Sequence, residues 1–158
     1  MALYGYNPTN GKELWRVETI GTHSTSCRPV TGLGMVYTTM GFSKGILLAV
    51  RPDGKGHVTK SHVAWRYTKA APKKPSILIK DDLLFMIDDG GVAACLEART
   101  GTEIWKERIG GNFSASPIMA GGMIYLFDEN GKGTVLAAER DFKVCLLYTS
   151  DAADELCR

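Results

Sequence analysis

The 158-residue sequence lacks the long apolar and helical segments that define many protein classes. No apolar run approaches the roughly 18 residues of a membrane-spanning helix, which excludes a span of that kind. Helical spacing of apolar residues is never sustained over the roughly ten to twelve residues of a helix, because a glycine or a turn interrupts it first. Only 150–157 looks helical, and it belongs to a tail considered below. The sequence therefore predicts an all-β protein.

Residue combinations that carry catalysis are also missing from the sequence. No two cysteines are adjacent, and Cys27 and Cys95 are too far apart for a metal-binding or redox pair. The three histidines, His23, His57 and His62, are too widely spread for a zinc site. No Gly-x-Ser-x-Gly elbow is present. We therefore expect no catalytic and no metal-binding residue in this chain.

Several short motifs match ligand-binding signatures only in part. The segment 131–134 lacks the first glycine of a phosphate-binding loop and the hydroxyl residue after its lysine. The segment 128–131 resembles half of a calcium loop, without its closing glutamate. The acidic pairs at 81–82 and 88–89 fit hairpin turns, where aspartate bonds its own backbone, better than an acid–base pair. The short basic run at 73–74 forms no nucleic-acid-binding stripe, so no nucleic-acid partner is expected.

The sequence does contain a short repeated motif, called the phrase below, that occurs three times. Residues 7–15 recur as 97–105, and a looser copy runs from 51 to 65. Every tryptophan of the chain ends one of these phrases, and a glycine precedes each in a turn. A phrase that returns at a fixed period indicates a repeat architecture. We expect six residues to act as structural anchors of the repeat: Gly11, Trp15, Gly54, Trp65, Gly101 and Trp105.

Each repeat contains further short runs that read as strands. A run opening with proline and a second apolar run precede each phrase, and Gly, Asn and Asp separate the runs as in tight hairpins. Four short antiparallel strands in about 40 to 45 residues are the signature of a β-propeller blade. We place blades at about 3–18, 28–67, 75–108 and 116–144, the first without its two inner strands.

The blade count predicts an open arc rather than a closed ring. About three and a half blades leave two sheet faces unpaired, and exposed edges and apolar faces favour association. Each tryptophan is expected on the outermost strand of its blade. There it fills the gap to the next blade and buries about 150–250 Å².

These residues resemble the repeat of the pyrroloquinoline quinone (PQQ)-like β-propellers. Three stretches, at 49–54, 62–69 and 110–117, resemble the PQQ-binding-like repeats common in planctomycetes and related bacteria. The resemblance covers residues 3 to about 144. The superfamily includes quinoprotein dehydrogenases and the non-catalytic lipoprotein of the outer-membrane β-barrel assembly machinery. No signal peptide opens the sequence, but the resemblance implies an exported protein, in the periplasm or otherwise extracytoplasmic.

Two functions follow from this resemblance. The first is a non-catalytic propeller that acts as a protein-interaction or scaffold module in the bacterial cell envelope, with a protein partner. The alternative is a fragment of a quinoprotein dehydrogenase. Dehydrogenases of the superfamily hold PQQ between a tryptophan floor and adjacent disulfide-linked cysteines, with calcium and an aspartate base. This chain has no adjacent cysteines, and its tryptophans belong to the repeat, so we expect no PQQ, no other cofactor and no metal here. Under the dehydrogenase alternative, the quinone site would lie in blades outside this segment.

The C-terminal end differs in character from the repeat. Residues 145–155 resemble the in-frame translation of a transposon-end adapter used in sequencing libraries. We interpret 145–158 as a non-native tail that does not continue the fourth blade. The alternative is a genuine tail with a short helix.

Overall fold

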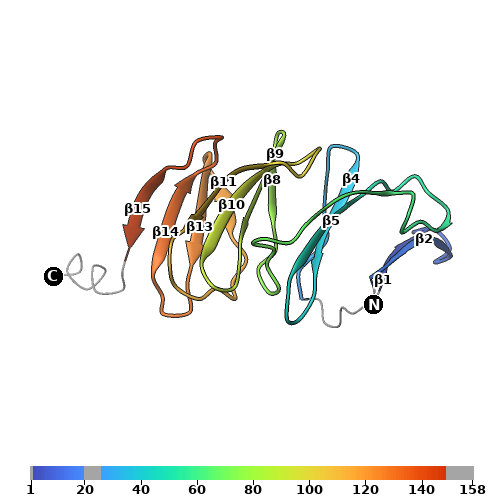
Figure 1. Ribbon diagram of the computed structural model, residues 1–158, viewed down its shortest axis with the longest axis horizontal. Coiled ribbons are helices and arrows are strands. Elements are labelled where there is room, and N and C mark those ends of the chain that lie inside the picture. Colours follow the sequence, from blue (N-terminus) through green and yellow to red (C-terminus); the bar gives the residue numbers. More distant parts are fainter. Residues whose placement is uncertain (1, 20–25, 149–158) are drawn as a thin grey trace.

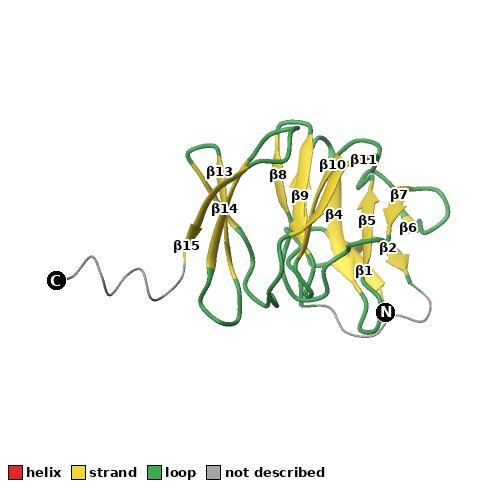
Figure 2. Cartoon of the chain, turned by 60° about the vertical axis from the view of Figure 1, so that its left-hand side comes forward, coloured by secondary structure: helices red, strands yellow, loops and turns green. Residues whose placement is uncertain are grey.

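The computed structural model describes residues 2–19 and 26–148, and within these ranges it contains strands and no helix (Figure 2). The strands form four sheets that follow one another along the molecule in chain order (Figure 1). The first sheet contains β1 (Ala2–Tyr6), β2 (Glu13–Glu18) and β6 (Gly56–His57). The second contains β3 (Val30–Gly32), β4 (Met35–Met40), β5 (Ile46–Val50) and β7 (Val63–Tyr67). The third contains β8 (Leu78–Lys80), β9 (Leu83–Ile87), β10 (Val92–Glu97) and β11 (Glu103–Arg108). The fourth contains β12 (Ile118–Ala120), β13 (Met123–Phe127), β14 (Gly133–Ala137) and β15 (Val144–Tyr148).

The second, third and fourth sheets are antiparallel, and each strand pairs with the next strand of the same sheet. Aspartate turns connect the two middle strands of the third and fourth sheets. Asp88 Oδ1 accepts hydrogen bonds from the backbone N–H groups of Gly90 and Val92, at 2.9 and 2.8 Å. Asp128 does the same for Asn130 and Lys132, both at 2.9 Å. The all-β architecture of four-stranded antiparallel units is therefore confirmed.

The first sheet is built differently from the other three. Among the described residues it pairs only two strands of its own repeat, β1 and β2, and it gains β6 from the insertion that follows residue 54. This short strand pairs in parallel with β2, Trp15 opposite Gly56 and Arg16 opposite His57. The insertion of the second repeat thus crosses over to extend the sheet before it, which the local sequence does not reveal.

The fourth sheet extends beyond the boundary expected from the sequence. Val144–Tyr148 forms β15, which pairs antiparallel with β14 and completes four strands, whereas the blade was expected to end at Val144. All five residues of β15 are exposed. The pairing corrects the expectation that the residues after Val144 leave the blade. The remaining tail, 149–158, lies outside the described residues.

The core lies between the sheets rather than inside any one of them. We call the three contact zones the first, second and third seams, in chain order. The first seam buries Trp15 and Val17 against Leu48 and Val50 of the second sheet. The second and third seams have larger clusters, and Tyr37, Leu84 and Leu96 in the second are all 0% exposed. The third seam buries Phe85, Cys95, Ile124 and Leu136, among others. No described helix is long and apolar enough to span a membrane.

Candidate functional site

Trp65 shows how the repeated phrase works in three dimensions. It lies on β7, the outermost strand of the second sheet, and its Nε1–H donates to Ala98 O in the third sheet, at 3.1 Å. The hydroxyl of Tyr37 donates to the same carbonyl, also at 3.1 Å. A Cβ on Gly101 would lie 2.6 Å from the Trp65 ring, so the turn approaches the indole closely because it has no side chain. The second seam therefore joins a tryptophan of one repeat to the glycine turn of the next.

Trp105 occupies the same position one repeat later, with different partners. Its Nε1–H donates to Glu139 O of the fourth sheet at 3.4 Å, and its ring meets Phe142 edge to face at 5.1 Å between centroids. Trp15 is 5% exposed and packs within the first seam, directly over Gly5 of its own sheet. All three indoles are thus engaged in contacts at seams.

The three glycines of the phrase do not occupy equivalent positions. Gly11 and Gly101 each have a positive φ, 69° and 73°, and each donates its N–H to the residue four positions earlier, at 2.8 Å. Gly54 has no positive φ, and a Cβ there would meet Val58 and His62. The insertion before Trp65 changes this turn, so Gly54 resembles the other two only in sequence.

Two serines at the inner edge of the sheets were not singled out from the sequence. The backbone N–H of Arg28 donates to Ser76 Oγ, and that of Ser76 donates to Ser116 Oγ, both at 3.0 Å. Each serine therefore ties its sheet to the preceding one. The signal was a serine that recurs beside the proline of the inner run, as in Pro75-Ser76 and Ser116-Pro117.

A cleft lies at the end of the second seam. It has a volume of about 400 Å³ and opens between the β4–β5 turn, the β9–β10 turn and the connection from β7 to β8. Lys44, Lys69 and Lys73 line it together with Asp88 and Asp89. Lys69 is paired with Glu103 at 3.5 Å, and Lys44 and Lys73 are the other two lysines of the lining.

Asp89 is the acidic counterpart of these lysines. Its Oδ2 accepts the backbone N–H of Lys73 at 2.8 Å, and its Oδ1 is buried without a hydrogen-bond partner among the described residues. The acidic pair of the sequence therefore serves two purposes, since Asp88 closes the turn and Asp89 holds the neighbouring connection. Neither arrangement brings two carboxylates together for acid–base work.

The two described buried cysteines are not activated nucleophiles. Cys27 and Cys95 are both free thiols. Burial raises the pKa of Cys27, and burial raises the pKa of Cys95 to about 12. Both thiols therefore stay protonated at neutral pH, and a thiol is a poor nucleophile in that form.

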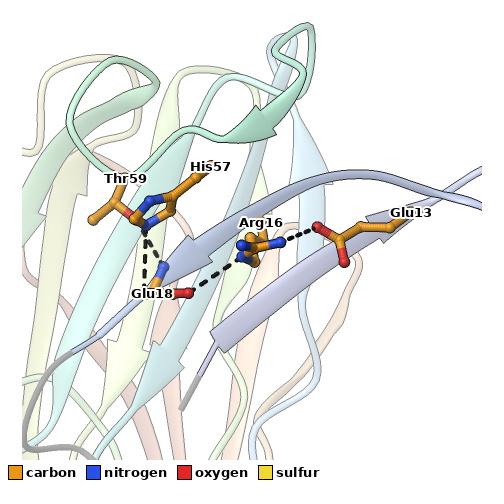
Figure 3. A network of polar contacts seen from close by, with 5 residues as sticks. All are labelled: Glu13, Arg16, Glu18, His57 and Thr59. Carbon is orange, nitrogen blue, oxygen red and sulfur yellow. Dashed lines mark hydrogen bonds and ion pairs between the residues drawn. The ribbon is translucent and has the colours of Figure 1, made fainter.

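The insertion forms a polar network with the first sheet (Figure 3). His57 Nε2 lies 2.9 Å from Thr59 Oγ1 and 3.4 Å from Glu18 Oε2, while the backbone N–H of Glu18 donates to Thr59 Oγ1 at 2.8 Å. Arg16 pairs with both Glu13 and Glu18, at 2.9 and 3.2 Å. A catalytic relay needs the nucleophile and the acid on opposite ring nitrogens of the histidine. Here one nitrogen meets both, so the network clamps the insertion and activates no hydroxyl.

Of the other two histidines, only His62 lies among the described residues. His62 hydrogen-bonds Ser61 at 2.8 Å, and His23 lies outside the described residues. Among residues 2–19 and 26–148, no three His, Cys, Asp or Glu side chains are grouped to hold a metal ion.

Comparison with known proteins identifies the repeat. A family model described as outer membrane protein assembly factor BamB matches residues 2–141. No curated protein sequence matches this chain.

Solved structures share the fold at low sequence identity. BamB from Moraxella catarrhalis superposes with a TM-score of 0.72 at 14% identity, over 92% of this chain and 42% of that one. A europium-containing methanol dehydrogenase gives 0.60 at 15% identity, over 82% of this chain and 26% of that one. The quinohemoprotein alcohol dehydrogenase ADHIIG from Pseudomonas putida HK5 gives 0.64 at 16% identity, over 80% and 21%. The chain thus spans less than half the length of each, and the likeness shows a β-propeller fold.

Proposed function

Since the chain belongs to the family of the outer membrane protein assembly factor BamB, we propose that it is part of a non-catalytic β-propeller that binds a protein partner in the bacterial cell envelope. The family description names an assembly factor, which supports a scaffold or interaction role and an extracytoplasmic location. Repeat scaffolds bind partners through the turns that their strands position.

The observation that carries the proposal is the lysine-lined cleft at the end of the second seam. Asp88 holds the β9–β10 turn, and the backbone N–H of Lys73 in the β7–β8 connection donates to Asp89, so the cleft is shaped before a partner arrives. Lys44 and Lys73 offer ammonium groups to carboxylates on the partner. We infer an acidic segment of an envelope protein as the group bound there.

The two dehydrogenases of similar fold favour a second function, that of a quinoprotein fragment. The described residues do not fit PQQ. A planar quinone needs an apolar slot with an open aromatic face. The Trp65 ring lies on Gly101 and the Trp105 ring packs between Phe85 and Phe142, while lysines and aspartates line the large cleft.

Site-specific cross-linking tests the first function. The protein is expressed in bacterial cells with a photo-reactive residue in place of Lys44. A matched control has the same residue in place of the exposed Lys60. We expect a discrete adduct with an outer-membrane assembly protein at position 44 that disappears in the Lys73→Glu background, and none at position 60. Equal labelling at both positions would contradict a partner site at the cleft.

Quinone binding tests the second function. The chain is incubated with PQQ and calcium and passed through a gel-filtration column. We expect no quinone absorbance to travel with the protein. Stoichiometric uptake would overturn the non-catalytic function and favour the dehydrogenase.

A further inference from the structure

The turn between β4 and β5, residues 41–45, departs from the pattern of its two counterparts. The turns at the same place in the third and fourth sheets begin with Asp88 and Asp128, whose carboxylates accept hydrogen bonds from the backbone of the turn. The β4–β5 turn begins with Gly41 instead and contains neither aspartate nor asparagine. Departures from a rule that the rest of the chain obeys are expected at functional sites.

Two buried glycines fix the ends of this turn. Gly41 has a φ of 122°, and a Cβ placed on it would collide with Lys44 O. A Cβ placed on Gly45 would collide with Ala71 O, in the connection from β7 to β8. Both close approaches require a residue without a side chain. The turn is therefore closed on itself at one end and rests on the neighbouring connection at the other, which gives its tip a defined position.

The tip of this turn has an exposed aromatic side chain. Phe42 is 65% exposed. The tips of the two aspartate turns have no apolar side chain, since they are Asp89 and Gly90 in one and Glu129 and Asn130 in the other. A phenyl ring left in water forgoes most of the stabilisation that burial of its apolar surface gives. Aromatic side chains are enriched where proteins bind other proteins, because a partner supplies that burial.

Phe42 lies at the rim of the lysine-lined cleft. The next three residues of the turn, Ser43, Lys44 and Gly45, all line the cleft. Lys73 lines it from the connection between β7 and β8. One rigid turn thus places an apolar ring two residues from a cationic side chain, beside a second lysine from another element.

We propose that the β4–β5 turn selects the sequence of the partner. Phe42 packs on an apolar or aromatic side chain that lies within a few residues of the acidic ones bound at Lys44 and Lys73. This inference rests on the proposed partner site at the cleft and supplies the second half of its specificity. Exposed ammonium–carboxylate pairs are weak and screened by salt, so lysines alone discriminate little between acidic segments. An apolar contact beside them excludes water and separates an acidic segment with an embedded apolar residue from a merely acidic one.

An aromatic side chain next to lysines also suits an anionic lipid surface. The composition of the cleft disfavours that occupant. Asp88 and Asp89 line it together with the lysines, and a lipid surface would bring phosphates of the same charge against them. The observations therefore favour a protein segment, and lipid binding is one of the outcomes that the experiment tests.

Selection from a random peptide library tests the proposal. The 158-residue chain is immobilised, peptides of random sequence displayed on phage are the probe, and circular dichroism checks the folding of each variant. We expect enriched peptides to combine Asp or Glu with Phe, Trp, Tyr or Leu within a few residues. Phe42→Ala should abolish the apolar preference and retain the acidic one, whereas the double variant Lys44→Ala, Lys73→Ala should abolish the acidic preference. Leu14→Ala is the matched control and should select as wild type does, because Leu14 is 44% exposed on β2 and does not line the cleft.

Fluorescence anisotropy with the most enriched peptide measures the size of the effect. Phe42→Ala should raise the dissociation constant about 30-fold, as loss of an aromatic anchor does. Phe42→Trp should bind within a few-fold of wild type, because it restores a ring. Replacing the apolar residue of the peptide by serine should weaken binding to wild type by a similar factor and weaken binding to Phe42→Ala little further, since the two changes remove the same contact.

The outcomes separate this proposal from the one on which it rests. Acidic peptides that Phe42→Ala and wild type enrich alike, without an apolar preference, would overturn the role of Phe42 and leave the acidic partner site in place. Peptides whose enrichment ignores both lysine substitutions would overturn the partner site itself, and no enrichment by the folded chain would overturn both. Flotation of wild type, but not of Phe42→Ala, with vesicles of phosphatidylglycerol and phosphatidylcholine would overturn the proposal in favour of a lipid surface.

Discussion

The second and third seams begin from the same sequence phrase and end in different contacts. In the second seam, Trp65 packs on the glycine turn at Gly101 and donates to Ala98 O. In the third seam the corresponding turn has no glycine, and Phe142 presents its ring to Trp105. Arg140 adds ion pairs from the fourth sheet to Asp82, at 3.0 Å, and to Glu97 in the third. The repeat therefore specifies the side of a seam that carries the tryptophan, while the side on which the tryptophan packs varies.

This difference indicates which interactions each seam depends on. The second seam depends on close backbone approach and on hydrogen bonds to one carbonyl. The third depends on aromatic contact and surface charge. Substitution of the tryptophan should therefore destabilise both seams to a similar extent. Substitutions on the side that receives the tryptophan should affect one seam and not the other.

The largest effect is expected from removing a tryptophan. Trp105→Ala and Trp65→Ala should each lower the free energy of unfolding by about 3 kcal/mol, because each leaves a cavity at a seam. Urea denaturation at fixed protein concentration measures this. Glu107→Ala, an exposed change on β11, should stay within about 0.5 kcal/mol of wild type. Loss of partner binding by a tryptophan variant at unchanged stability would contradict a purely structural role.

Substitutions in the turns at Gly101 and Gly11 should measure the contribution of the contact between Gly101 and Trp65. Gly101→Ala should cost about 2 kcal/mol, because it adds both the strain of a positive φ and a clash with the Trp65 ring. Gly11→Ala has the same strain without the clash and should cost about 1 kcal/mol. The difference between their urea midpoints isolates the contact at the second seam. Equal losses would show that the indole adapts freely to the turn.

A smaller effect concerns the bond from Tyr67 to Glu103, at 2.7 Å, beside the second seam. This hydrogen bond, followed by the nearby Lys106 and Lys69, lowers the pKa of Glu103 below its usual 4.5. Because the folded pKa is depressed, the stabilisation is fully present above pH 4.5 and is lost as the pH falls through the folded value. Tyr67→Phe should cost about 1 kcal/mol at pH 7. The gap from wild type should narrow in urea titrations below pH 4.5, and a gap independent of pH would contradict this assignment.

The smallest effect should come from Arg140 at the third seam. Its ion pairs with Asp82 and Glu97 are solvent-exposed, so Arg140→Gln should lower the melting temperature less than Tyr67→Phe does. The difference should vanish at about 1 M salt, where exposed pairs are screened. A loss that persists in salt would indicate packing by the side chain rather than charge.

Much of the fold could be predicted from local sequence. Strand runs, aspartate turns and the outer-strand positions of Trp65 and Trp105 are encoded within one repeat, because hairpin partners are neighbours in the chain. Trp15 was also expected on an outermost strand, but β6 pairs beyond β2 and makes its strand the middle one of the first sheet. Contacts between residues of different repeats could not be predicted in this way. Three such contacts form only when the sheets stack on one another. They are the parallel pairing of β6 with β2, the hydrogen bond from Ser76 to Ser116, and the packing of Phe142 on Trp105 where the other seam has a glycine turn. The lysine-lined cleft is of the same kind, since three separate connections form it.

The sequence by itself determined the unit, a blade of four short antiparallel strands, because alternation and turn chemistry act within a few residues. Only the tertiary structure decided what each face of a blade meets. Tyr37 and Tyr125 have the same type and the same register position, yet one is fully buried and the other is not. Burial depends on whether another sheet packs on the residue, and for Tyr37 that sheet is the third, which comes from the next repeat along the chain.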